Sequence, residues 1–172
     1  MDVRASLLTL VDRVAVGTPI DEAAAGLELG WDEHGNHATD FLAAPAVWRK
    51  LEPGELGALI DWFLAHGADG ARMLERSVAD MASRDAAPSP IRAHLLKRAA
   101  LPDLAPALIA AFRARRLGLA RTFLTHGADP VALGAWVEPD LVTPKALGVR
   151  YQASGQTQRV TLAIRLLRLH PA

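Results

Sequence analysis

The chain has 172 residues, no net formal charge and no cysteine, and 51% of its residues are hydrophobic. The absence of cysteine excludes disulfides, thiolate metal sites and cysteine nucleophiles. No stretch approaches 18 uncharged apolar residues, which excludes a membrane-spanning helix, and the charged Asp2 and Arg4 do not fit a signal peptide, so we expect a cytoplasmic protein.

Composition favours an all-α fold, because alanine and leucine are abundant and aromatic residues make up only 5% of the chain. Apolar residues at helical spacing predict an amphipathic helix over 3–16, which ends at Gly17. Apolar residues show no clear helical or strand spacing over residues 20–36. A second helix is predicted over 38–51, and Pro45 is expected to kink or split it.

The same spacing predicts five further helices, at 53–66, 71–84, 90–100, 104–116 and 119–126. Pro53 and Pro90 each suit the first turn of a helix, and Ser89 suits the N-cap position before Pro90. Gly67 and Gly127 suit the C-terminal cap of a helix, because glycine accepts a left-handed backbone.

The remainder of the chain is less regular. Residues 130–156 are rich in glycine and proline and are predicted to be loop, whereas 157–169 fit either a helix or a strand. We divide the chain into a capping helix with its connector at 1–30 and a repeat domain at 31–172.

Charge is distributed unevenly along the chain. Residues 1–86 carry 15 acidic and 7 basic side chains, and residues 87–172 carry 4 acidic and 12 basic ones. In an elongated molecule this split of −8 and +8 predicts two ends of opposite charge. We expect a monomer or weak self-association.

One segment occurs twice, as FLAHGADG at 63–70 and FLTHGADP at 123–130. Each copy places an apolar pair on the last turn of a helix, a glycine at its end and an aspartate that can start a turn. His66 and His126 hold the same position in the two copies, and we expect each imidazole to link neighbouring loops.

These residues resemble the ankyrin repeat, whose helix pair ends in Leu-Leu-x-x-Gly-Ala-Asp and opens with Thr-Pro-Leu-His-x-Ala. Residues 105–130 fit this pattern best, and 31–44 open another copy that ends at the first HGAD. A degenerate copy lies between them, and its predicted end at Arg98 is 32 residues after His66 and 28 residues before His126. Thr143-Pro144 suggest a last copy.

The resemblance covers residues 31–172 and implies an α-solenoid of three to four stacked antiparallel helix pairs. The openings are degenerate and the spacing is uneven. The amphipathic helix within 1–30 is expected to cap the open end of the stack, because a terminal repeat cannot leave its core face exposed to water.

The motif WDEHGNH at 31–37 is the strongest candidate for chemistry. Asp32, Glu33, His34 and His37 are possible metal ligands, but zinc sites need three or four ligands at defined spacing. The alternative is a tight hairpin in which Gly35-Asn36 supplies the positive φ. We expect no metal site, no cofactor and no catalytic residue, and we attribute His66 and His126 to the repeat rather than to a catalytic pair.

A basic cluster follows in the second half of the chain and comprises Arg92, Lys97, Arg98, Arg113, Arg115, Arg116 and Arg121. Such a cluster can bind nucleic acid through phosphate contacts. Only Phe112 offers an aromatic ring for stacking within it. A solvated helical face is therefore the preferred interpretation, and we do not expect nucleic acid to be the partner.

The sequence thus predicts a non-enzymatic module that binds a partner protein. The residues predicted to face the partner are Trp31, Asp32, Glu33, His34, Arg113, Arg115, Arg116 and Trp136. An exposed tryptophan at a loop tip is a common interface anchor, whereas Trp62, beside Phe63 on a helix, is expected in the core. The alternatives are nucleic-acid binding through 92–121 and a small metal-dependent hydrolase built on 32–37.

Overall fold

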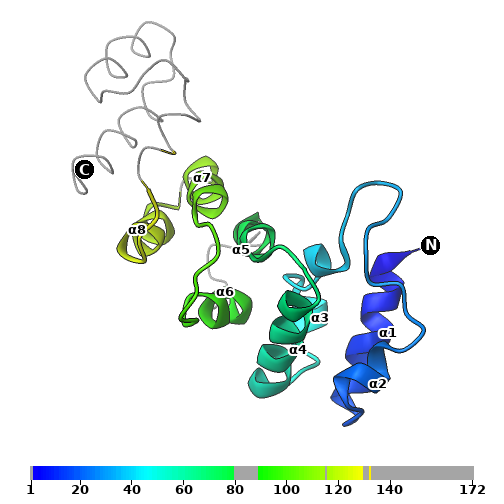
Figure 1. The fold of residues 1–172 in the computed structure, drawn as a ribbon. Coiled ribbons are helices and arrows are strands. Elements are labelled where there is room, and N and C mark those ends of the chain that lie inside the picture. Colours follow the sequence, from blue (N-terminus) through cyan, green and yellow to red (C-terminus); the bar gives the residue numbers. More distant parts are fainter. Residues whose placement is uncertain (1, 80–88, 115, 130–131, 133–172) are drawn as a thin grey trace, which may run out of the picture. The chain divides into compact units, whose positions relative to one another are not determined.

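The computed structural model describes residues 2–79, 89–114, 116–129 and 132 (Figure 1). Within these residues the chain is helical, with one isolated β-bridge and no strand, so the all-α prediction is confirmed for this part of the chain. None of its helices is long and apolar enough to cross a membrane. Two compact units are present, one ending at Pro102 and the other beginning at Asp103.

The first unit begins with helix α1, Val3–Ala15, which packs against the short helix α2, Ile20–Ala24. Asp2 caps α1 by accepting hydrogen bonds from two backbone amides of its first turn. Near its other end, Arg13 donates to the carbonyl oxygens of Ala23 and Ala25. The aperiodic region 20–36 therefore contains a short helix that periodicity did not reveal.

The first helix pair consists of a broken first arm and a continuous second helix. Its elements are the 3-10 helix η1, Ala38–Phe41, the helix α3, Pro45–Trp48, and the helix α4, Pro53–Ala65. Pro45 splits the first arm, as predicted. At the start of α4, Pro53 occupies the first turn and Glu52 forms a capping box with Glu55.

Two further pairs follow, made of α5, Gly70–Ala79, with α6, Pro90–Leu95, and of α7, Ala105–Arg113, with α8, Leu117–Thr125. Within the first unit, α5 packs on α6 and η1, and α4 packs on α6 (Figure 1). In the second unit, α7 packs on α8. The predicted end of the 71–84 helix lies outside the described residues.

The prediction that the Ser89 side chain caps α6 is wrong. Ser89 does precede α6, but its side chain makes no cap hydrogen bond. The hydroxyl is buried and has no hydrogen-bond partner. Pro90 contributes as expected, because it occupies the first turn of the helix.

Both HGAD segments end their helices in the same way. Gly67 and Gly127 have φ values of 85° and 96°, and the alanine after each donates to the carbonyl oxygen five residues earlier at 3.0 Å. Asp69 then accepts hydrogen bonds from two amides of the first turn of α5. Phe63 and Phe123 are buried at equivalent positions.

The second helices of the three pairs end at regular intervals. Their last residues are Ala65, Leu95 and Thr125, each 30 residues after the one before. The residue that corresponds to His66 and His126 is therefore Leu96, the C-cap of α6, and not Arg98. The 30-residue interval is not apparent from the sequence because the middle copy lacks the His-Gly-Ala-Asp motif.

Candidate functional site

Residues 31–37, here called the 31–37 hairpin, form a tight turn between α2 and η1. Trp31 and His37 pair across it as an antiparallel bridge, and the amide of Asp32 donates to the carbonyl oxygen of Asn36 at 2.8 Å. Gly35 has a φ of 74°, which a glycine adopts without strain. The hairpin prediction for this motif is therefore confirmed.

The carboxylate of Asp32 is used to build the turn. It accepts hydrogen bonds from the amides of His34 and Asn36, both at 2.8 Å, and from the side-chain nitrogen of Asn36 at 3.0 Å. These bonds, led by the one from the Asn36 amide, hold the pKa of Asp32 below its usual value. Asp32 is therefore a structural acceptor, and the exposed Glu33 and His34 occupy the tip beside it.

Trp31 is the most prominent side chain of the hairpin. Its side chain and backbone together are 61% exposed, although tryptophan is a large apolar residue. The guanidinium of Arg72 lies 4.7 Å from the centroid of the indole ring, and the ring of His37 contacts it edge-on at 5.2 Å. The indole is thus held in one orientation and still reaches solvent.

A buried ion pair fastens the hairpin to α5. Asp40 in η1, with a side chain only 4% exposed, accepts two hydrogen bonds from Arg72, one of them from Nε at 2.6 Å. It also accepts from the backbone amide of His37 at 3.0 Å. Nη2 of Arg72 in turn donates to the carbonyl oxygen of Gly35 at 3.0 Å, so one guanidinium holds both η1 and the turn.

The electrostatics of this cluster follow from the same contacts. Burial raises the pKa of Asp40. The hydrogen bonds from Arg72 and His37 and the positive charges of Arg72 and Arg76 lower this pKa by more than burial raises it, so the net shift is downward. Burial lowers the pKa of His37; the charge of Asp40 opposes this shift and that of Arg72 adds to it. Its Nδ1 lies 2.8 Å from Oγ1 of Thr39.

Asp32 and His37 of the WDEHGNH motif are therefore engaged in contacts within the protein, whereas Glu33 and His34 are exposed. Asp32 bonds the turn, His37 bonds Thr39, and Glu33 lies 3.6 Å from His34. Among the described residues, no group of three or more histidine, aspartate or glutamate side chains is arranged to hold a metal ion.

The remaining residues predicted to face a partner lie elsewhere. Arg113, at the end of α7, is exposed, and Arg116, just before α8, is half-buried; both belong to the second unit. Arg115 and Trp136 lie outside the described residues. The basic cluster is also smaller than the sequence suggests, because Arg92 is only 8% exposed and cannot belong to a solvated face.

Two sequence interpretations need correction here. His66 and His126 do not link neighbouring loops: the Nδ1 of each lies 2.7 Å from a carbonyl oxygen of its own helix, four residues earlier. Trp62 is half-buried rather than in the core. Its indole stacks on His66 at 4.0 Å and donates to Asp21 in α2 at 2.7 Å.

Sequence reasoning found Trp31 but missed the residues that hold it. Asp40 and Arg72 are 32 positions apart, and no local pattern pairs them. The one available signal is the repeat length, which places residues about one repeat apart on adjacent pairs. Comparisons with protein-family profiles, curated proteins and solved structures find no match for this chain.

Proposed function

We propose that the protein is a non-enzymatic interaction module that binds a partner protein through the 31–37 hairpin. We also propose that its helix pairs stack as a degenerate ankyrin-like solenoid. The stacking is supported by the 30-residue interval between the ends of the second helices. It is supported further by the contacts of α5 with η1 and of α4 with α6, which join like elements of successive pairs.

The observation that carries the binding proposal is the exposure of Trp31. A large aromatic side chain that is 61% exposed leaves apolar area in water, which a partner can cover. Tryptophan is also among the residues that most often dominate the binding energy of an interface.

The rigidity of the hairpin supports the same proposal. Arg72 fixes the indole and the Gly35 carbonyl oxygen, and the buried Asp40 fixes Arg72. Binding through a surface that is already ordered loses little conformational entropy. The exposed Glu33 and His34 beside Trp31 would form the polar rim of such an interface.

The two alternatives have less support. Nucleic-acid binding requires exposed cations, and Arg92 is buried while Arg98 donates to Asp61. A metal-dependent hydrolase built on 32–37 requires free ligands, whereas Asp32 and His37 are engaged in the turn.

A site-specific crosslinking experiment tests the proposal. A photoreactive amino acid is placed at position 31 and, in a control protein, at Val16, which is 82% exposed on the C-cap of α1. We expect a distinct protein adduct only from position 31. An excess of unlabelled wild-type protein should abolish it, and an excess of Trp31→Ala protein should not. Identical adducts from positions 31 and 16 would refute the proposal.

A further inference from the structure

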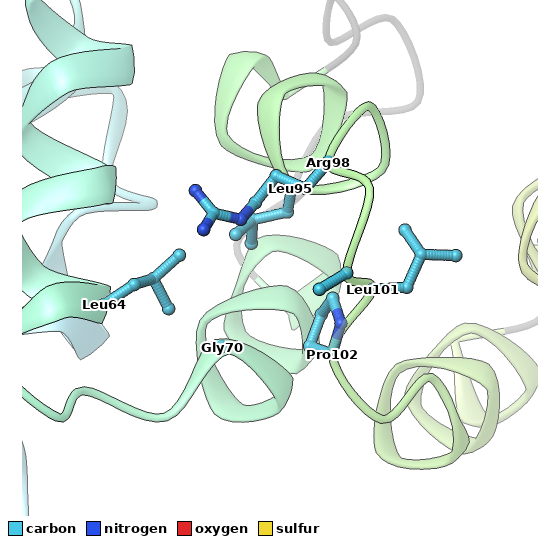
Figure 2. A pocket seen from close by; sticks show the side chains of 7 residues that line it. Leu64, Gly70, Leu95, Arg98, Leu101 and Pro102 are labelled. Atoms are coloured by element: carbon cyan, nitrogen blue, oxygen red, sulfur yellow. The ribbon is translucent and has the colours of Figure 1, made fainter.

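A pocket of about 230 Å³ opens on the first unit, away from the residues of the 31–37 hairpin. Figure 2 shows Leu64, at the end of α4, on one side of Gly70, and Pro102 on the other. Leu95 at the end of α6, Ala100 and Leu101, which is 39% exposed, complete the apolar lining. The pocket is therefore made where two successive second helices end.

The glycine in this pocket is required for its depth. A Cβ on residue 70 would lie 3.2 Å from Cδ2 of Leu64 and 3.2 Å from Cβ of Pro102. These distances are tighter than ordinary van der Waals contact, so any side chain at this position would occupy the space between the two walls. Gly70 does not have a positive φ, so the space rather than the backbone conformation explains the glycine.

Among the seven described residues that line the pocket, Arg98 alone is charged. Its Nη1 donates to Oδ1 of Asp61, and the same oxygen lies 3.0 Å from Nε2 of His94. The Nε and Nη2 groups of Arg98 have no hydrogen-bond partner among the described residues. Arg98 can therefore bind a second carboxylate through these two groups.

The size and lining of the pocket limit what it can hold. Pockets for small molecules and cofactors are usually about 300–1,000 Å³, and this one, at about 230 Å³, suits a single side chain. No aromatic residue is among its lining residues, so it offers no ring on which a nucleic-acid base could stack. An aliphatic side chain fits the apolar walls, and a carboxylate fits the cation at the rim.

We propose that this pocket is a docking site for an acidic segment of a partner protein, in which a leucine-sized side chain rests in the pocket over Gly70 and the adjacent Asp or Glu binds Arg98. The charge of the site selects this occupant, because Arg98 is a cation and no acidic residue is among the described residues that line the pocket. The site is independent of the 31–37 hairpin.

The probe is the blocked peptide acetyl-Ala-Leu-Glu-Ala-amide, titrated into the full chain while the methyl signals of Leu64, Leu95 and Leu101 are followed by NMR. One buried aliphatic side chain with one exposed ion pair is expected to give a dissociation constant of ~10 mM, because the entropic cost of association offsets part of the gain. Peptides with Gln or Lys in place of Glu should bind about two- to fivefold more weakly, and a peptide with Ala in place of Leu should not shift the methyl signals.

Variants identify the residues responsible. Arg98→Gln should weaken the Glu peptide to the level of the Gln peptide, and Lys97→Gln, which changes a neighbouring cation outside the pocket, should have little effect. Gly70→Ala should weaken binding about tenfold, because the added methyl fills the space that the ligand needs. Leu101→Ala, at a more exposed wall, provides a second variant in case Gly70→Ala disturbs the fold.

The proposal is overturned if the Glu peptide leaves these methyl signals unchanged at concentrations well above the expected dissociation constant. It is also overturned if the Glu and Lys peptides bind equally, or if Lys97→Gln weakens binding as much as Arg98→Gln. None of these outcomes bears on Trp31, so the two proposals fail or succeed separately.

Discussion

Replacing Arg72 with methionine tests how strongly the buried ion pair holds the 31–37 hairpin. The variant keeps a long side chain but removes both hydrogen bonds to Asp40, the hydrogen bond to the Gly35 carbonyl oxygen and the stacking on Trp31. Removing one partner of a buried pair costs about 3–5 kcal/mol. Because Arg72 is 27% exposed and Nε of Arg76 remains 3.6 Å from Asp40, we expect the low end, about 3 kcal/mol.

The loss of stability should depend on pH. In the wild type, burial raises the pKa of Asp40 but Arg72 and the His37 amide lower it more, so this carboxylate stabilises the fold above its unfolded pKa of about 3.9 and loses that effect as pH falls through its lower folded pKa. In Arg72→Met the hydrogen bonds and the positive charge of Arg72 no longer offset the effect of burial, so the pKa of Asp40 in the folded state rises. The cost of the variant should therefore be larger at about pH 7 than at about pH 3.5.

Urea denaturation followed by tryptophan fluorescence measures this effect, because Trp31, Trp48 and Trp62 all lie in the first unit. The matched control is Arg76→Met. Because the Arg76 side chain is 45% exposed, its replacement should lower the free energy of unfolding by less than about 1 kcal/mol. Equal losses at the two pH values, or an equal loss in Arg76→Met, would show that the Asp40–Arg72 pair does not carry the stability assigned to it.

Three further outcomes are expected. Gly67→Ala should lower the free energy of unfolding by about 1–2 kcal/mol in urea titrations, because a Cβ at φ 85° is strained although nothing lies within 4 Å of it; Gly54→Ala, which is also unobstructed and has no positive φ, should not be destabilising. Gly57→Ala should cost about 1–3 kcal/mol, because its Cβ would lie 3.0 Å from the His94 ring, and the double variant with His94→Ala should recover part of this loss. Elemental analysis of purified protein should detect no stoichiometric zinc; one zinc per chain that is lost in His34→Ala would contradict this prediction.

Local signals in the sequence predicted helix starts and ends where these depend on residues a few positions apart, but the helix predicted over 90–100 ends at Leu95 and the one predicted over 104–116 ends at Arg113. Pro53 at a first turn, Pro45 in a broken arm and Gly67 and Gly127 at helix ends all act through their own backbone conformation. Gly35 also acts through its own backbone conformation, because its positive φ forms the turn of the 31–37 hairpin. In such cases the local chemistry and the tertiary structure agree.

Contacts between helix pairs were not predicted, because they depend on which elements pack together. The burial of Arg92, the partial exposure of Trp62 and the Asp40–Arg72 pair each arise between segments well separated in sequence. For the same reason the sequence placed Trp31 at a loop tip but did not identify the Arg72 guanidinium beneath it. The helix-or-strand question at 157–169 concerns residues outside those described.

Because Arg72 follows Asp40 by 32 residues, the surface around Trp31 cannot be completed during synthesis until α5 has been made. The hairpin leaves the ribosome before α5, and the guanidinium that orients the indole arrives only with Arg72. Until then Asp40 lacks the cation that compensates its burial. A nascent or truncated chain that stops before α5 therefore has the hairpin sequence but lacks the guanidinium that orients Trp31, and the surface around Trp31 is complete only after the second helix pair has begun to fold.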